Sequence, residues 1–303
     1  MKILIAGATG AVGLPLARSL ATLGLEVSGL IRADTGVEKL REIGVTPISA
    51  DAFDVDSLRK AMSVIKPDAV IDQLTWLPAN PAEVISALPN DTRLHREGGN
   101  NLLTAALEAG VTRYIMQSRG FYLYAPKGKL ADECAKLRFD APTVVGDSAR
   151  AIGEYEARLL AATKVKATVL RYGFFYGPGT WYSPCGAVAE QMRAGEGVII
   201  GDGDAVWSFV HIDDAVAATV AAITAAPGAY NVVDDDPLTV RENLERFARW
   251  VGAKEPKPIT VEDALEIAGQ EAVYYHLNLT GASNSLAKAE LGFQPRPLLW
   301  KGE

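Results

Sequence analysis

A glycine-rich segment directly after the first apolar run has the residue types that bind a pyrophosphate. Residues 7–13 read Gly-Ala-Thr-Gly-Ala-Val-Gly, between the apolar run 2–6 and a predicted helix over 12–23. Glycines permit a tight turn and let the backbone approach phosphate, while the following helix offers free N–H groups and a positive dipole end. The sequence therefore predicts a dinucleotide site. Its predicted contact residues are Gly7, Thr9, Gly10, Ala11, Val12 and Gly13.

Further motifs follow along almost the whole chain. Residues 98–103 have the pattern G-x-x-N-L-L, and residues 170–179 read LRYGFFYGPG. Residues 209–215 read FVHIDDA, and the segment 283–295 ends in LGFQP. Together with the GxxGxxG spacing, this set resembles the extended short-chain dehydrogenases/reductases, the epimerase/dehydratase-like group. The resemblance implies an oxidoreductase with a nicotinamide cofactor, a small-molecule substrate and a homodimer that pairs through helices near 94–109 and 147–162.

The resemblance also implies where the rest of the cofactor lies. Asp51 and Ala52 match the stretch that packs on the adenine. The segment after the fourth predicted strand lines the cofactor, and the 170–179 loop passes the nicotinamide. The implied contacts in these two segments are Leu74, Thr75, Tyr172, Gly173 and Phe174.

The end of the second predicted strand bears on the choice of cofactor. NAD-specific sites place an acidic residue there for the ribose 2′-hydroxyl. By the family spacing this position is Ile31, and Arg32 follows it. An apolar residue beside a guanidinium favours a 2′-phosphate, so we predict NADP(H) in preference to NAD(H). The alternative is that Arg32 is a solvated loop charge.

The acid–base residues of the resembled family are missing. That family keeps a Tyr and a Lys four residues apart on one helix, and these positions fall on Ser148 and Ile152 or on Ala149 and Gly153. The position of its catalytic serine falls on Gly120. The family tyrosine exchanges a proton with the substrate and a nearby lysine lowers its pKa. A reduction survives this loss better than the oxidation that begins a sugar epimerisation.

Two hydroxyl groups remain as candidates to handle a proton. Ser118 matches the first serine of the family stretch after the fifth strand, and Tyr124 matches the tyrosine of that stretch. Tyr122 and Tyr155 are further candidates. We expect Tyr155 to matter less, because the residue four positions later is Leu159.

Aromatic residues dominate the predicted substrate region. Trp207 stands where nucleotide-sugar enzymes of the family commonly have an arginine for the diphosphate. This substitution favours a small apolar or aromatic substrate over a nucleotide sugar. The predicted substrate contacts are Trp76, Tyr122, Tyr155, Phe175, Trp181 and Trp207.

Histidine and cysteine offer little further chemistry. His95 and His211 are isolated, and an isolated histidine is more often structural than catalytic. Cys134 and Cys185 are far apart and lack metal or redox spacing, so no metal site is predicted.

We therefore predict an NADP(H)-dependent reductase without the usual Tyr-x-x-x-Lys pair. Two alternatives remain: a nucleotide-sugar epimerase or dehydratase that has replaced its acid–base pair, and a protein that senses the NADP redox state without turnover.

The elements that must position these residues alternate between strand and helix. Strands are predicted over 2–6, 26–31, 46–50, 69–73, 113–117 and 167–172. Helices are predicted over 12–23, 37–43, 56–65, 94–109 and 147–162. This order predicts an α/β fold with a doubly wound parallel sheet of the Rossmann type over residues 1–172. After residue 172 we predict a strand over 206–210, helices over 187–194 and 213–224, and a smaller substrate-binding lobe over 173–303, with some strands returning to the sheet.

Composition limits the range of partners and locations. The 303 residues carry a net charge of −7, and no basic block is present. Nucleic-acid and anionic-membrane binding are therefore not expected. No apolar run approaches the ~18 residues of a membrane span, and the chain begins directly with a strand pattern. These features predict a cytoplasmic protein.

Overall fold

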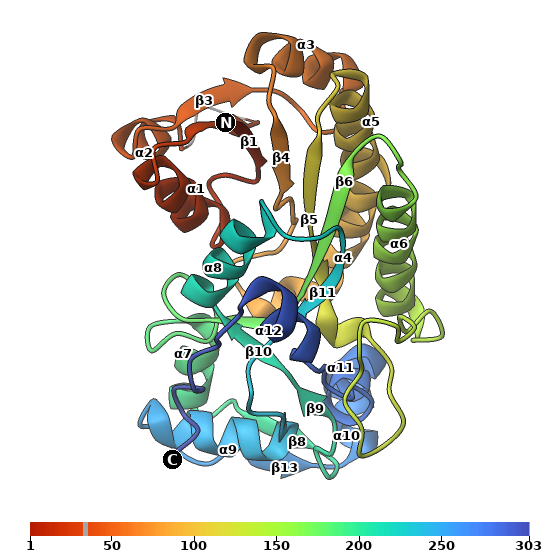
Figure 1. The fold of residues 1–303 in the computed structure, drawn as a ribbon. Helices are drawn as coiled ribbons and strands as arrows, with labels where there is room; N and C mark the ends of the chain where they lie inside the picture. The colour runs from red at the N-terminus through yellow and green to blue at the C-terminus, as the bar shows by residue number, and fades with distance from the viewer. Residues whose placement is uncertain (33–35, 303) are drawn as a thin grey trace.

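The computed structural model describes residues 1–32 and 36–302. Its centre is a seven-stranded parallel sheet in the order β11-β6-β5-β4-β1-β2-β3 (Figure 1). The strand order reverses between β1 and β4, and such a reversal opens a ligand crevice at the carboxyl ends of the strands. The predicted doubly wound α/β fold is confirmed. The strands are β1 (Lys2–Ala6), β2 (Glu26–Ile31), β3 (Thr46–Ser49), β4 (Ala69–Asp72), β5 (Arg113–Arg119), β6 (Lys166–Tyr172) and β11 (Gly228–Val232).

Helices cover both faces of this sheet because its strands are apolar on both sides. Ile3 and Ile5 of β1 pack toward one layer, while Leu4 and Ala6 pack toward the other. The first layer holds α1 (Gly13–Thr22), α2 (Val37–Glu42), α8 (Ile212–Ala222) and α12 (Ser285–Leu291). The second layer holds α3 (Val55–Ile65), α5 (Asn100–Glu108) and α6 (Thr143–Leu160).

A smaller lobe lies beyond the carboxyl ends of the strands, at the bottom of Figure 1. Its strands form the pairs β7–β10, β9–β12 and β8–β13. Its core includes Trp300, which is fully buried and lies 5.0 Å from the Phe247 ring and 5.2 Å from the Phe209 ring. The strands are β7 (Phe174–Tyr176), β8 (Val198–Ile200), β9 (Val206–Trp207), β10 (Phe209–His211), β12 (Leu238–Thr239) and β13 (Lys257–Ile259). The helices are α7 (Ala187–Ala194), α9 (Val240–Trp250), α10 (Val261–Ile267) and α11 (Gly269–Leu277).

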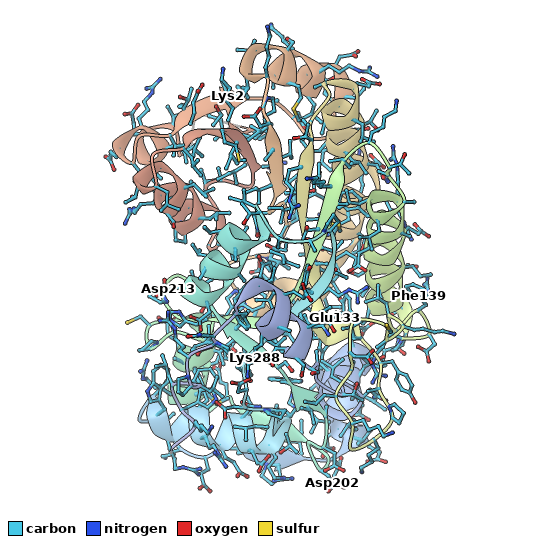
Figure 2. All side chains as sticks on the ribbon, in the orientation of Figure 1. Lys2, Glu133, Phe139, Asp202, Asp213 and Lys288 are labelled. Atoms are coloured by element: carbon cyan, nitrogen blue, oxygen red, sulfur yellow. The ribbon has the colours of Figure 1, made fainter. Side chains whose placement is uncertain are left out.

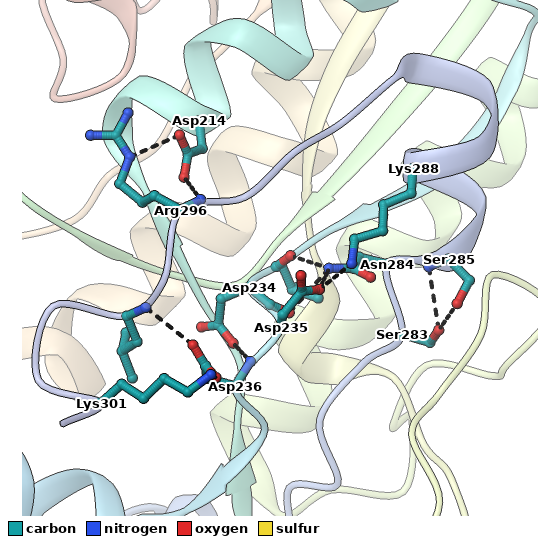
Figure 3. Close-up of polar contacts among 12 residues, drawn as sticks. Asp214, Asp234, Asp235, Asp236, Ser283, Asn284, Ser285, Lys288, Arg296 and Lys301 are labelled. Carbon is teal, nitrogen blue, oxygen red and sulfur yellow. Dashed lines mark hydrogen bonds and ion pairs between the residues drawn. The ribbon is translucent and has the colours of Figure 1, made fainter.

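The C-terminal segment ties the lobe to the sheet layers (Figure 3). Arg296 Nε donates to the carboxylate of Asp214 at the start of α8, at 2.9 Å. Lys301 forms an ion pair with Asp236, which follows β11. The segment therefore crosses from the helices that cover the sheet to the core of the smaller lobe.

The structure departs from the predicted elements on one side of the site. The predicted helix 94–109 is a π-helical turn, η2 (Leu94–Gly99), followed by α5. It continues α4 (Val84–Arg93), a helix that the sequence analysis missed because Pro89 lies inside it. The predicted strand 206–210 is also wrong as one element, since β9 and β10 are separated at Ser208.

Candidate active site

The glycine turn after β1 is pressed against the end of β4. Gly7 has a φ of 77°, and its carbonyl accepts the N–H of Gly10 at 3.0 Å. A Cβ on Gly13 would lie 2.0 Å from the Gly7 oxygen, and a Cβ on Gly7 would lie 2.4 Å from the Gln73 oxygen. Glycine is therefore required at both positions for α1 to begin this close to the strand ends.

The start of α1 suits an anion. Within the described chain, no side chain caps this helix at Val12, and its first turn holds no acidic residue. The first N–H groups and the positive end of the dipole thus remain for a ligand. Ala11 is exposed at this end, and Thr9 lies against Gly36, where a Cβ would be 2.6 Å from the threonine methyl carbon. The turn fits the pyrophosphate of a dinucleotide.

A cavity of about 290 Å³ opens beyond β2, β3 and β4. The guanidinium carbon of Arg32 lies 4.8 Å from the centre of the Trp76 ring, which is a cation–π contact. This pair brings the end of β2 beside the segment after β4. The sequence analysis predicted five of the residues that line the cavity: Arg32, Asp51, Ala52, Thr75 and Trp76. It did not predict the other three, which are Phe53, Leu77 and Leu94.

The G-x-x-N motif positions one wall of this cavity. Asn101 Nδ2 donates to the Ala52 carbonyl at 3.1 Å, and a Cβ on Gly98 would lie 3.1 Å from the Ala52 Cβ. Asp51 accepts the Phe53 N–H at 3.0 Å and so fixes the turn after β3. The motif therefore acts through packing and a backbone contact.

The loop from β6 to β7 is packed tightly beside η3 (Gly120–Tyr122). The hydroxyl groups of Tyr172 and Thr219 lie 2.6 Å apart, and a Cβ on Gly173 would lie 2.5 Å from the Ser208 oxygen. The Phe174 ring stacks on Phe121, with 4.4 Å between their centres. These contacts hold the predicted nicotinamide loop against the end of β5.

Neither register of the family motif supplies an acid or base on α6. Ser148, Ala149 and Ile152 are buried, and a Cβ on Gly153 would lie 2.8 Å from the Phe139 ring. Phe139 lies at the edge of the molecule beside α6 (Figure 2). These four positions pack the helix on its neighbours.

A buried ion pair occupies the space beside Ser148. Arg119 Nη1 donates to Ser148 Oγ at 2.6 Å, and Arg119 Nη2 donates to the Asp91 carboxylate. Asp91 also accepts the Trp76 N–H at 2.8 Å, and His95 Nε2 lies 3.5 Å from it. Burial opposes the charge of Asp91, but Arg119 and His95 still hold the pKa of this carboxyl below its usual value. We call these four side chains, Asp91, His95, Arg119 and Ser148, the Arg119 cluster.

The sequence analysis missed two members of this cluster. Asp91 lies on the helix that was not predicted. Arg119 directly follows Ser118 at the end of β5, and its charge just after the carboxyl end of a predicted parallel strand was the available signal.

The two predicted proton donors do not come together. Ser118 is buried and donates to Glu156, which pairs with Arg171 at 2.6 Å. Tyr124 is 53% exposed and stacks on Arg138, whose guanidinium carbon lies 4.9 Å from its ring centre.

Tyr155 lies between α6 and the sheet. It is fully buried, and its hydroxyl donates to Asp72 at 2.7 Å and lies 2.6 Å from the Tyr114 hydroxyl. Burial raises the pKa of Tyr155 well above 10. This placement gives Tyr155 a packing role behind the strands.

The other predicted substrate residues surround the junction of the lobes. Trp181 Nε1 donates to the Pro78 carbonyl at 3.2 Å, and Trp207 Nε1 donates to the Tyr275 carbonyl at 2.9 Å. Tyr122 is buried with its hydroxyl 3.1 Å from that of Tyr275. Phe175 packs against Tyr172, with 5.3 Å between the ring centres. The junction is therefore mainly aromatic.

Residues 1–32 and 36–302 contain no group of three potential metal ligands from His, Cys, Asp and Glu. None of the helices in these ranges has the length and apolar character to cross a bilayer. Both cysteines are free and exposed.

Known proteins resemble the chain over its full length. The sequence model of the NAD dependent epimerase/dehydratase family matches residues 3–233. A 3-diazoavenalumate denitrifying reductase from a Streptomyces species is 36% identical over 99% of this chain and 98% of that protein.

Two solved structures share the fold. The UDP-glucose 4-epimerase of Thermus thermophilus in complex with NAD has a TM-score of 0.76, 25% identity and coverage of 100% of this chain and 96% of that one. The UDP-glucose 4-epimerase of Thermotoga maritima with UDP-glucose has a TM-score of 0.78, 24% identity and the same coverage.

Proposed function

Because this chain belongs to the NAD dependent epimerase/dehydratase family, we propose that it is an NADP(H)-dependent reductase that passes hydride to a small aromatic substrate without an acid–base pair on α6. The glycine turn, the uncapped start of α1 and the adjoining cavity fit the dinucleotide that this family uses. When bound, its dihydronicotinamide supplies a hydride.

The observation that carries the proposal is the burial of the family's tyrosine and lysine positions. Ser148 is engaged by Arg119, and Ile152 has no ionisable group. Reduction of a carbonyl group needs a proton as well as a hydride. An enzyme that lacks the proton donor is suited to an acceptor that needs the hydride alone.

An aryl diazonium ion is an acceptor of this kind. Its ring carbon takes the hydride and forms a C–H bond with the hydride electron pair. The pair of the C–N bond leaves with the nitrogen, so the products are a neutral arene and N₂, and no proton is consumed. The Streptomyces relative, a denitrifying reductase named for a diazo substrate, supports this class.

The aromatic junction suits a cationic aromatic substrate. Phe121 and Phe174 stack on each other, and aromatic rings of this kind can also stack with a planar ligand and attract positive charge through their faces. The Arg119 charge is balanced by Asp91, so it does not oppose a cation as a free guanidinium would.

The preference for NADP(H) is supported by the position of Arg32. Its side chain lines the cavity beside Trp76, and no carboxylate of residues 1–32 or 36–302 forms an ion pair with it. A guanidinium without a carboxylate partner can pair with the 2′-phosphate of NADP(H).

Isotope transfer tests the proposal. We would mix the protein with NADPH deuterated at C4 and benzenediazonium, and measure N₂ release and deuterium in the benzene product above a protein-free control. We expect the enzyme to transfer deuterium from NADPH to the benzene product, and we expect the product to take up no deuterium from deuterated water. Turnover of acetophenone in place of benzenediazonium, or of a nucleotide sugar, would contradict the proposed acceptor. Absence of any turnover would favour the redox-sensor alternative.

A further inference from the structure

Arg138 is a buried cation in an unusual setting. The residue is only 6% exposed, and its backbone N–H donates to the Tyr122 carbonyl at 2.8 Å. Its guanidinium carbon lies 4.9 Å from the Tyr124 ring centre and 5.8 Å from the Tyr274 ring centre. The guanidinium therefore makes cation–π contacts with two tyrosines.

This guanidinium lacks an anionic partner. Its Nε has no hydrogen-bond acceptor, and its Nη1 makes only a 3.4 Å contact with the Tyr274 hydroxyl. Across residues 1–32 and 36–302, no carboxylate forms an ion pair with it. A buried charge without a partner destabilises the fold, because no attraction offsets the free energy lost when the charge leaves water.

The other buried arginines make more contacts than Arg138, although Nε of Arg113 also lacks a hydrogen-bond partner. Arg119 pairs with Asp91, and Arg171 pairs with Glu156. Arg113 donates to three oxygen atoms, those of Thr168, Ala222 and Ala225. Arg138 is thus the buried arginine, among the described residues, whose guanidinium forms neither an ion pair nor a hydrogen bond to a backbone oxygen.

Arg138 also stands beside the aromatic junction. The antiparallel bridge between Leu123 and Leu137 pairs its strand segment with the one that carries Tyr122. Tyr122 reaches the Tyr275 hydroxyl and packs edge-on to Phe121 at 4.8 Å. From this bridge the rings of Tyr122 and Phe121 lead to Phe174, beside the β6–β7 loop.

We propose that Arg138 binds the carboxylate of an aromatic acid whose reacting ring lies at the junction. The planar guanidinium can form two parallel hydrogen bonds with a carboxylate, which an ammonium cannot do. The Tyr274 hydroxyl adds a third donor. Tyr124, whose ring lies on this guanidinium, is 53% exposed. The inference deepens the proposed function and rests on its assignment of an aromatic substrate.

Ligand binding tests this anchor without turnover. Calorimetry would compare trans-cinnamate with its neutral analogue trans-cinnamamide, using protein with and without NADP⁺. We expect the acid to bind at least about 10-fold more tightly, because a charge-assisted bond to a buried guanidinium supplies that much. Arg138→Gln should weaken cinnamate binding by about 10–100-fold and leave cinnamamide unchanged.

Two further variants separate recognition from packing. Arg138→Lys keeps the charge and should retain a reduced preference for the acid. Lys127→Gln removes one positive charge from the same segment, where Lys127 is exposed beside Asp204, and should change neither affinity. Equal binding of acid and amide by the wild type, or equal weakening of both by Arg138→Gln, would overturn the proposal.

The same assay separates this inference from the proposed reaction. Selective cinnamate binding without hydride transfer to benzenediazonium would leave the anchor standing and reject the reaction. Hydride transfer without a preference for the acid would reject the anchor alone.

Discussion

Arg119 Nη1 donates a 2.6 Å hydrogen bond to Oγ of Ser148, the residue in one of the two registers for the family's tyrosine. A positively charged side chain with fixed partners therefore lies beside the position at which the family has its proton-donating tyrosine. Asp91 pairs with this cation, so the Arg119–Asp91 pair beside the predicted nicotinamide loop is polar but has no net charge.

Loss of that cation should destabilise the fold. We expect Arg119→Leu to lower the free energy of unfolding by about 3–5 kcal/mol, because Asp91 would remain buried without its partner. Urea denaturation measures this loss. The double variant Arg119→Gln with Asp91→Asn should recover part of it. Arg59→Leu, which breaks exposed ion pairs with Asp56 and Glu108, should cost much less stability than Arg119→Leu; an equal cost for both single variants would refute the role of the cluster.

Cofactor preference should depend on Arg32. Calorimetric titration should show tighter binding of NADP(H) than of NAD(H), and Arg32→Ala should reduce NADP(H) affinity by about 10–100-fold. NAD(H) affinity should change little. Arg41→Ala is the matched control, since Arg41 is exposed on α2 and pairs with Glu38. A wild type that prefers NAD(H) would show that Arg32 has another role.

Tyr124→Phe should distinguish the two kinds of acceptor. A positioned general acid contributes about 10²–10⁴-fold to rate. With an aryl diazonium substrate we expect turnover to be nearly unchanged, because no proton is consumed. With a carbonyl substrate, a loss of that size would instead identify Tyr124 as the donor. Tyr155→Phe should lower the unfolding free energy without a selective effect on turnover, as its hydroxyl is bound to Asp72.

Nucleotide sugars should bind poorly. Trp207 is buried and donates to Tyr275, so no cation meets a diphosphate at this position. Titration with UDP-glucose of protein saturated with NADP⁺ should give no saturable binding in the micromolar range. Tight binding would return the epimerase alternative to first place.

Acidification should weaken the fold through His276. Burial lowers its pKa from 6.5 to about 4, so the folded protein binds a proton less readily than the unfolded chain. Stability from this group is present above pH 6.5 and is lost as the pH falls toward 4. We expect the wild type to lose on the order of 3 kcal/mol more than His276→Gln over this range. Parallel losses in urea denaturation at both pH values would exclude the effect.

Local patterns made much of the sheet predictable. The boundaries of β1 and β2 agree with the predicted ranges, because a short apolar run between turn residues is specified by neighbours in sequence. The glycine turn was predictable for the same reason. Its required geometry involves Gly7, Gly13 and the adjoining strand end.

The polar cluster was not predictable in the same way. Arg119 contacts Asp91 and Ser148, which lie 28 and 29 residues away in the sequence. Asp91 belongs to α4, a helix that contains Pro89 and was not predicted. The outward position of Tyr124 and the inward position of Tyr155 also depend on tertiary packing. A side chain's residue type alone does not reveal which face of the protein it occupies.

The position of Trp300 has a consequence for biosynthesis. This ring fills the centre of the smaller lobe, where it meets Phe209, Phe247 and Tyr176. A growing chain on the ribosome cannot complete that core until residue 300 has been made, although the β1–β6 portion of the sheet is available much earlier. Until then the aromatic side chains of the lobe lack this packing partner, and transiently exposed apolar surface promotes aggregation and chaperone binding.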